Sequence, residues 1–227
     1  MVIDDQSSDK TFEIARAVVA GDDRFIVERA EPKGYALGNR VRIGKRIATD
    51  PEDVHVVVDG DDWLAHDRVL ETLDRVYADP DVWITWGSHQ YWKDKILHRL
   101  GIRKARGNAF PYPDVIAENR LYRYHLFFAT HLRTYKRFLY DAIRDEDLRD
   151  EDGEYYKYAG DVADMIPMLE MAGPRHSRFL EDVLYVYNGA NALSDFRVNL
   201  DGQMLLNARI RSKPRYEPME RRPDAAR

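Results

Sequence analysis

The chain has 227 residues, 44% of them apolar, which is enough to form the buried core of one large or two small domains. Its formal charge of −5 provides no general attraction to nucleic acid, which we do not expect as a partner. The absence of cysteine excludes disulfides and thiolate zinc sites, and the longest apolar runs are far shorter than the ~20 residues that span a bilayer, so we expect no transmembrane segment and a cytoplasmic location.

Residues 1–92 alternate strand-like and helix-like segments, a pattern typical of an α/β layered fold. Strand 54–58 is the clearest of them, because it is short, rich in valine and almost continuously apolar. Gly87 is expected to end the last strand of this half. The predicted strands are 2–3, 25–27, 54–58 and 82–86, and the predicted helices lie around 12–19, 41–47 and 66–77.

The second half has weaker periodicity and more aromatic side chains. We expect residues 93–208 to be mixed helix and loop, with a helix over 162–171 that Pro167 delays or kinks. Residues 209–227 are rich in basic residues and proline, which predicts a loose tail. The whole pattern predicts a single α/β domain with a mostly parallel central sheet flanked by helices, and a second half rich in helix and loop.

Acidic side chains follow two of the predicted strands. In a mostly parallel sheet the carboxyl ends of the strands share one edge, so these acids should converge. Closely packed carboxylates repel one another unless a cation balances them, and oxygen ligands suit Mg²⁺ or Mn²⁺. Aspartate is also favoured in turns for purely local hydrogen bonding. The acids are Asp4 and Asp5 after the first strand, and Asp59, Asp61 and Asp62 after strand 54–58.

Two segments that contain these acids resemble motifs of a known family. Residues 2–11 read VIDDQSSDKT and residues 56–64 read VVVDGDDWL, and both resemble segments of family 2 glycosyltransferases with the GT-A fold. The resemblance implies inverting transfer of a sugar from a nucleotide diphosphate sugar, commonly UDP-linked, to a hydroxyl of a glycan or other acceptor, with Mn²⁺ or Mg²⁺ as cofactor. It implies a nucleotide-sugar-binding half over 1–92 and an acceptor-side half over 93–208.

The resemblance also implies roles for the acids. It assigns Asp4 and Asp5 to the nucleotide, with Asp4 reading the base, and it places Asp59 near the ribose. Asp61 would hold the metal that bridges the diphosphate, and Asp62 would be a further or alternative ligand. A metal at this position would neutralise the charge that builds on the leaving diphosphate.

Further candidates come from other parts of the chain. Residues 131–134 and 185–188 resemble second-half features of some family members, and His131 could complete a metal shell, although a lone histidine is often structural. Trp86 and Ser88 follow a core strand and could form the floor of an acceptor pocket, because aromatic faces stack on sugar rings. Core packing explains Trp86 equally well.

Inversion at the sugar requires a base that accepts the proton of the acceptor hydroxyl. In the family this acid lies near the start of a helix in the second half. Asp161 is the matching candidate here, and Asp164 is its rival. An aspartate at a helix start can equally serve as a cap or as a partner of the helix dipole.

The chain also departs from the family pattern. The family begins with a strand ahead of the first motif, and this sequence starts after that point. Where the family often has Ala-Arg-Asn, this chain has Leu37–Asn39, so Asn39 matches but a cation expected near the diphosphate is missing. Lys33 or Arg40 could compensate for that missing cation.

Two other functions remain open from the sequence. A Mg²⁺-dependent nucleotidyltransferase would also cluster acids at strand ends. A catalytically inactive GT-A-like module that binds a glycan or a protein partner could retain the fold without the chemistry. A Gly-rich loop ending in Gly-Lys-Ser/Thr is missing from the sequence, which argues against P-loop chemistry.

Overall fold

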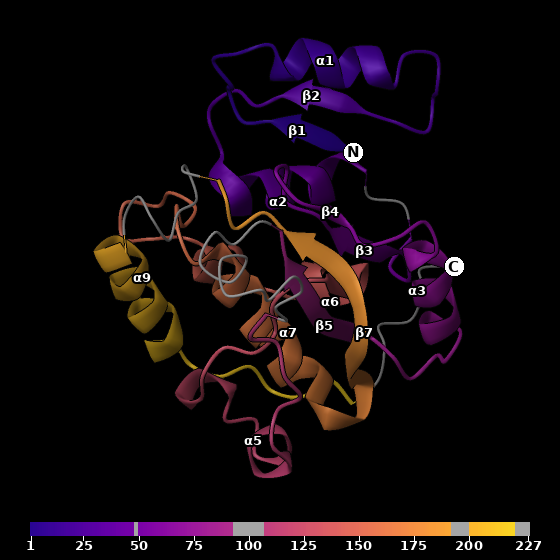
Figure 1. Ribbon diagram of the computed structural model, residues 1–227. Coiled ribbons are helices and arrows are strands. Elements are labelled where there is room, and N and C mark those ends of the chain that lie inside the picture. The colour runs from indigo at the N-terminus through magenta and orange to yellow at the C-terminus, as the bar shows by residue number, and fades with distance from the viewer. Residues whose placement is uncertain (48–49, 93–106, 192–199, 221–227) are drawn as a thin grey trace, which may run out of the picture.

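The computed structural model describes residues 1–47, 50–92, 107–191 and 200–220 (Figure 1). Strands and helices alternate along the first half, and two longer helices occur in the second half. In chain order the elements are β1 (Val2–Asp4), α1 (Thr11–Val18), β2 (Val27–Arg29), α2 (Tyr35–Arg46), β3 (Val54–Val57), β4 (Trp63–Leu64), α3 (Val69–Tyr77), β5 (Ile84–Tyr91), α5 (Asp114–Glu118), η1 (Tyr122–Tyr124), β6 (Arg133–Lys136), α6 (Arg137–Asp141), η2 (Asp145–Leu148), α7 (Gly160–His176), β7 (Ser177–Tyr187) and α9 (Leu200–Ser212).

The predicted α/β fold with a helix-flanked sheet is confirmed, but the sheet is mixed rather than mostly parallel. Its strand order is β3-β6-β5-β7-β4, and among these pairings only β5 with β7 is parallel. The cause is β6, which lies between β3 and β5 and runs antiparallel to both. The sequence does not predict this placement, because β6 comes from the half read as helix and loop.

A second correction concerns β1. This strand pairs in parallel with β2 in a separate two-stranded sheet, and in the described residues it forms no ladder with β3. In Figure 1, β1, β2 and α1 form a layer at the top of the molecule, next to α2. The premise that β1 and β3 share one sheet edge is therefore wrong, and the acids that follow them have different surroundings.

Helices cover the two faces of the central sheet (Figure 1). Val69 and Leu73 of α3 are buried in one apolar cluster with Leu132, Leu184 and Tyr185. The larger cluster lies around α7, whose apolar side chains pack with aromatic residues of β5, β6 and α6. Removing this much apolar surface from water is the main favourable term in folding, and it fixes the start of α7 against the sheet.

Several element boundaries differ from the prediction. β5 continues through Gly87 to Tyr91, and its register against β7 shifts on either side of Ser88. α7 starts at Gly160, earlier than predicted, and continues through Pro167. Its backbone leaves helical geometry at Gly173, where φ is 61°. Glycine suits that position because it has no Cβ, and a Cβ at positive φ would clash with the backbone.

The described part of the basic C-terminal segment is packed rather than loose. The Tyr216 amide donates to the Glu170 carboxylate over 3.1 Å, and the Met219 amide donates to the Met171 carbonyl over 2.8 Å. Residues 213–219 thereby cover part of α7. In the ranges that the structure describes, every helix is too short or too polar to cross a membrane.

Candidate functional site

The turn after β3 is held to the end of β7 by hydrogen bonds. The Asp59 amide donates to the Tyr185 hydroxyl over 3.1 Å, and that hydroxyl donates to Asp62 Oδ2 over 2.7 Å. The Asn188 amide donates to Asp62 Oδ1 over 2.6 Å. Pairing of β4 with β7 places the acidic turn here, with Trp63 opposite Val186. The Asp62 carboxylate is therefore fixed in direction.

His131 completes a cluster with two of these acids. One ligand atom from each of Asp59, Asp62 and His131 lies within 4.8 Å of the others. The imidazole stacks on Tyr185, with ring centroids 4.6 Å apart and planes 9° from parallel. Burial lowers the pKa of His131 to about 3, so the imidazole is neutral at pH 7 and has a free lone pair. His131 Nδ1 is buried and has no hydrogen-bond partner.

The two carboxylates of the cluster have different electrostatic surroundings. Burial raises the pKa of Asp62 to about 6, with Asp61 and Asp59 acting in the same direction. Burial alone would also raise the pKa of Asp59, but the charge of Arg133, with a smaller effect of Arg40, overcomes it and holds that pKa below its ordinary value. Asp59 is thus a stable anion, while Asp62 without a nearby cation carries an unfavourable charge.

These three residues fit a divalent cation. Carboxylate oxygens suit Mg²⁺ and Mn²⁺, and a neutral imidazole nitrogen is a common ligand of transition metals, so the donor set suits Mn²⁺. The unsatisfied buried Nδ1 of His131 and the raised pKa of Asp62 are both features that a bound cation would relieve. The arrangement is that of a candidate metal centre.

Asp61 lies outside this cluster. Its carboxylate is exposed and accepts a hydrogen bond of 2.6 Å from the Asn191 side chain. The three adjacent acids of the sequence motif therefore separate, with Asp59 and Asp62 facing His131 and Asp61 facing the chain beyond β7. The sequence predicts that acids gather in this turn, but it does not show which of them share one centre.

Arg133 connects the candidate metal centre to the start of α7. Its Nη2 lies 3.3 Å from Asp59 Oδ2 and its Nη1 lies 3.4 Å from Asp161 Oδ2. The residue is only 4% exposed. A buried guanidinium is costly unless it is paired with anions, so both contacts of Arg133 should be retained. Since the guanidinium is planar and rigid, the two contacts fix the Asp59 and Asp161 carboxylates relative to each other.

Asp164 has different surroundings from Asp161. It is 2% exposed, and its Oδ2 lies 2.7 Å from Nε of Arg40, which comes from α2. A Cβ at Gly160 would lie 2.8 Å from Arg40 Nη2 and 2.9 Å from Leu37 Cβ, so only glycine allows α2 this close to α7. Asp164 is therefore enclosed, while a third of the Asp161 side chain is exposed.

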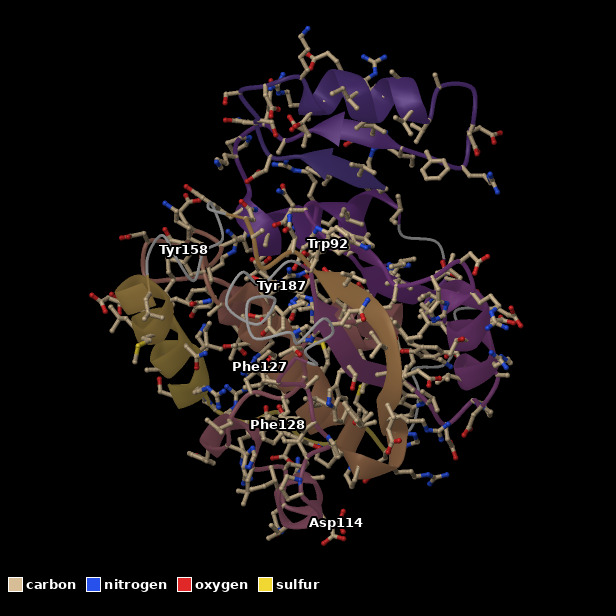
Figure 2. All side chains as sticks on the ribbon, viewed as in Figure 1. Trp92, Asp114, Phe127, Phe128, Tyr158 and Tyr187 are labelled. Carbon is tan, nitrogen blue, oxygen red and sulfur yellow. The ribbon has the colours of Figure 1, made fainter. Side chains whose placement is uncertain are left out.

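A cavity of about 770 Å³ opens beside Asp161. Its walls come from residues 123–127, from the first turn of α7 and from one side of α9. Phe127, which lines it, is labelled near the middle of the molecule in Figure 2, and the label of Tyr187, the last residue of β7, stands above it. A molecule of several rings could reach the Asp161 carboxylate from this side.

The first two predicted nucleotide-binding acids have local partners. Asp4 is 5% exposed, and its Oδ2 lies 3.2 Å from Nε of Arg29. Asp5 accepts hydrogen bonds from the Gly34 and Tyr35 amides over 2.8 and 3.0 Å, which satisfies free N–H groups at the start of α2. Neither acid belongs to the cluster of Asp59: Asp4 ties β1 to β2, and Asp5 joins the β1–β2 layer to the start of α2.

The residues expected near the diphosphate, Lys33, Asn39 and Arg40, also have partners within the protein. Lys33 is exposed, with its Nζ 5.4 Å from the centre of the Tyr35 ring. Asn39 is buried, and a Cβ at Gly34 would lie 2.4 Å from its Oδ1, so the amide packs against the start of α2. Arg40, the other candidate, is held by Asp164. The buried Arg133 lies beside the candidate metal centre.

Trp86 and Ser88 lie in the interior of β5, each 5% exposed. Trp86 donates its indole N–H to the Phe110 carbonyl over 2.8 Å and contacts Tyr112. Neither residue is among those that line the cavity beside Asp161. A role for them in acceptor binding stays a prediction.

Sequence reasoning missed two residues of this site. Arg133 and Tyr185 both fall in the two stretches that resemble family features, but the sequence does not predict a site role for either. An arginine inside a buried strand is a usable signal, because such a charge requires anionic partners. The hydrogen bonds of Tyr185 depend on the pairing of β7 with β4, which the local sequence does not encode.

Comparisons with known proteins agree with the fold. The family described as "Glycosyl transferase family 2" matches residues 1–144. No curated protein sequence matches the chain.

Among solved structures, S. aureus TarS has a TM-score of 0.57 and 19% identity over 82% of this chain and 30% of its own. The structure of TarS 1-349 has a TM-score of 0.55 and 18% identity over 82% of this chain and 50% of its own. The chain thus spans half or less of the length of these structures, which share its GT-A-like fold. Because the family match covers well over half of the sequence, the chain belongs to glycosyl transferase family 2.

Proposed function

We propose that this chain is a metal-dependent, inverting glycosyltransferase that moves a sugar from a nucleotide diphosphate sugar, UDP-linked, to an acceptor hydroxyl. The observation that carries the proposal is the contact of one buried arginine with two acids. Arg133 joins Asp59 of the candidate metal centre to Asp161, which faces an open cavity. This layout supports a donor side and an acceptor side separated by one side chain.

The metal would be held by Asp59, Asp62 and His131. When bound, Mn²⁺ or Mg²⁺ would supply positive charge that matches the charge of the leaving diphosphate. The protein's own contribution is a rigid ligand set. Tyr185 and the Asn188 amide direct the Asp62 carboxylate, and stacking on Tyr185 orients the imidazole.

Asp161 is the proposed base. Its carboxylate would accept the proton of the acceptor hydroxyl as that oxygen attacks the anomeric carbon from the face opposite the leaving group, which inverts the configuration. Asp164 is the weaker candidate because it is enclosed by Arg40. Its proposed role is to hold α2 against the first turn of α7 and so to keep Asp161 in place.

A transfer assay with UDP-sugars tests the function. The purified chain is incubated with each sugar and an acceptor mixture in Mn²⁺, in Mg²⁺ and in EDTA, and product configuration is determined by NMR. We expect metal-dependent release of UDP and inverted product. Asp161→Asn should lower kcat by about 10²–10⁴, the usual contribution of a general base.

Asp114→Asn is the matched control. Asp114 is an exposed acid of α5 at the far end of the molecule in Figure 2, so the same change there should leave kcat unaltered. Full activity of Asp161→Asn would overturn the assignment of the base. Turnover of UDP-sugars unaffected by EDTA, or retention of configuration, would overturn the metal dependence or the inverting mechanism.

A further inference from the structure

The cavity beside Asp161 has one wall that belongs to the C-terminal helix. Gln203, Met204, Asn207 and Arg211 of α9 all line it. Their spacing places them on one side of the helix, so α9 presents a continuous strip to the cavity. Its volume of about 770 Å³ lies within the ~300–1,000 Å³ range of small-molecule sites.

The rim of this cavity carries exposed apolar side chains. Tyr124 is 76% exposed, Leu126 is 72% exposed and Met204 is 63% exposed. Large apolar side chains left in water beside a cavity are typical of ligand-binding sites. Gln203 and Asn207 add neutral amides to the same lining. Flat apolar faces next to amide hydrogen-bonding groups suit a sugar ring, whose C–H face is apolar and whose edge bears hydroxyls.

The two arginines that line the cavity, Arg123 and Arg211, are already held by groups of the protein. Arg123 is neutralised by a two-pronged contact with Glu170, at 2.8 and 2.9 Å. Arg211 donates from Nη1 to three backbone carbonyls of residues 122–125 and from Nε to Asn207. The Asp161 carboxylate pairs with the buried Arg133, which does not line the cavity, and the exposed third of its side chain would repel a phosphate or carboxylate on the ligand.

We propose that this cavity is the acceptor site and that it takes an uncharged saccharide, with α9 selecting among acceptors. The inference rests on the proposed function, since Asp161 would deprotonate the saccharide hydroxyl. It goes beyond that function by assigning the acceptor's class and the wall that recognises it. Tyr124 and Met204 provide the apolar contacts, and Gln203 and Asn207 provide hydrogen bonds to hydroxyls.

A glycan microarray tests the inference by binding alone. The full chain is applied, with UDP and Mn²⁺, to neutral oligosaccharides and to matched glycans bearing phosphate, sulfate or carboxylate. We expect binding to neutral glycans. Met204→Ala and Tyr124→Ala should each weaken that binding about tenfold, the loss that follows from removing one apolar contact.

Leu205→Ala is the matched control, because Leu205 is 71% exposed on the same helix and does not line the cavity. All three side chains are exposed, so their removal leaves the core intact. Preferential binding of anionic glycans, binding that Leu205→Ala weakens as much as Met204→Ala does, or no glycan binding would overturn the inference. UDP-sugar turnover is measured separately from glycan binding. Turnover without binding of neutral glycans would therefore overturn only the acceptor inference, and glycan binding without turnover would overturn only the proposed function.

Discussion

At the scale of single residues, the site depends on buried cations that hold acids in place. Arg133 and Arg40 each reach the first turn of α7 from a different element, one from β6 and one from α2. Arg133 pairs with Asp161 in that turn, and Arg40 pairs with Asp164 directly after it. The two ion pairs therefore set where Asp161 lies relative to the candidate metal centre.

Arg133→Lys tests this bridge. A lysine carries the same charge, but its single ammonium cannot span Asp59 and Asp161 as the planar guanidinium does. We expect kcat to fall about 10- to 100-fold with a smaller change in the donor KM, because misplacing a reacting group by ~1 Å is that costly. The measurement is steady-state UDP release.

Arg137→Lys provides the control for this substitution. Arg137 pairs with Asp141 at 3.0 Å within α6, away from the candidate site. It should retain wild-type kcat and thermal stability. If Arg133→Lys and Arg137→Lys had equal kcat values, the bridging role of Arg133 would be wrong.

At the scale of elements, α1 and α7 differ strongly in their packing. In α1 no residue is buried, and Ile14 and Val18 are 58% and 77% exposed. In α7 nearly every residue is buried, from Gly160 to Gly173. Buried apolar contacts set the free energy needed to open a segment locally, so the two helices should open with very different probabilities.

Hydrogen exchange measured by mass spectrometry tests this difference. Peptides covering Thr11–Val18 should exchange at least tenfold faster than peptides covering 162–171. A uniform protection across both helices would show that the β1–β2 layer opens only with the whole domain, contrary to this expectation.

The elements also show how far local sequence predicts the fold. β3 and α3 were predicted within three residues, because their apolar periodicity is a property of contiguous residues. The mixed sheet was not predicted, because β6 joins β3 through partners about 80 residues away, such as Val54 with Lys136. The break expected at Gly87 is absent because β7 continues the pairing past it.

For the candidate site too, the sequence predicts the local motif but not the contacts between distant segments. The motif after β3 predicts a metal at Asp61 and Asp62, with His131 as a further candidate ligand, and it places Asp59 near the ribose. The structure instead brings Asp59 and Asp62 together with His131. The sequence could not separate Asp61 from Asp62, since only the contact with β7 turns Asp62 inward. The bridge through Arg133 required three segments to meet in space.

At the scale of the whole molecule, buried titratable groups link stability to pH. His89 is 2% exposed, and burial lowers its pKa to about 4, below the usual value of 6.5. Above pH 6.5 the imidazole is neutral in both folded and unfolded chains, and its contribution to the free energy of unfolding is fully present. Between pH 6.5 and 4 the unfolded chain takes up a proton that the folded chain does not, so this contribution is lost as the pH falls.

Asp62 acts in the opposite direction over part of this range, because its pKa is raised to about 6. The prediction therefore concerns the difference between wild type and His89→Gln. The free energy of unfolding of wild type, relative to that of His89→Gln, should fall by about 3 kcal/mol between pH 7 and pH 4. Urea denaturation in EDTA measures it, and a difference independent of pH would show that folding does not lower the pKa of His89.

Asp59, Asp62 and His131 are the proposed ligands of one divalent cation. Titration of Mn²⁺ into the metal-free chain by calorimetry tests this assignment most directly. We expect one site per chain, weakened at least tenfold by His131→Ala and by Asp62→Asn. Asp61→Asn, which removes the same charge from the same turn, should weaken it less. Unchanged Mn²⁺ affinity in His131→Ala and Asp62→Asn would contradict the assignment.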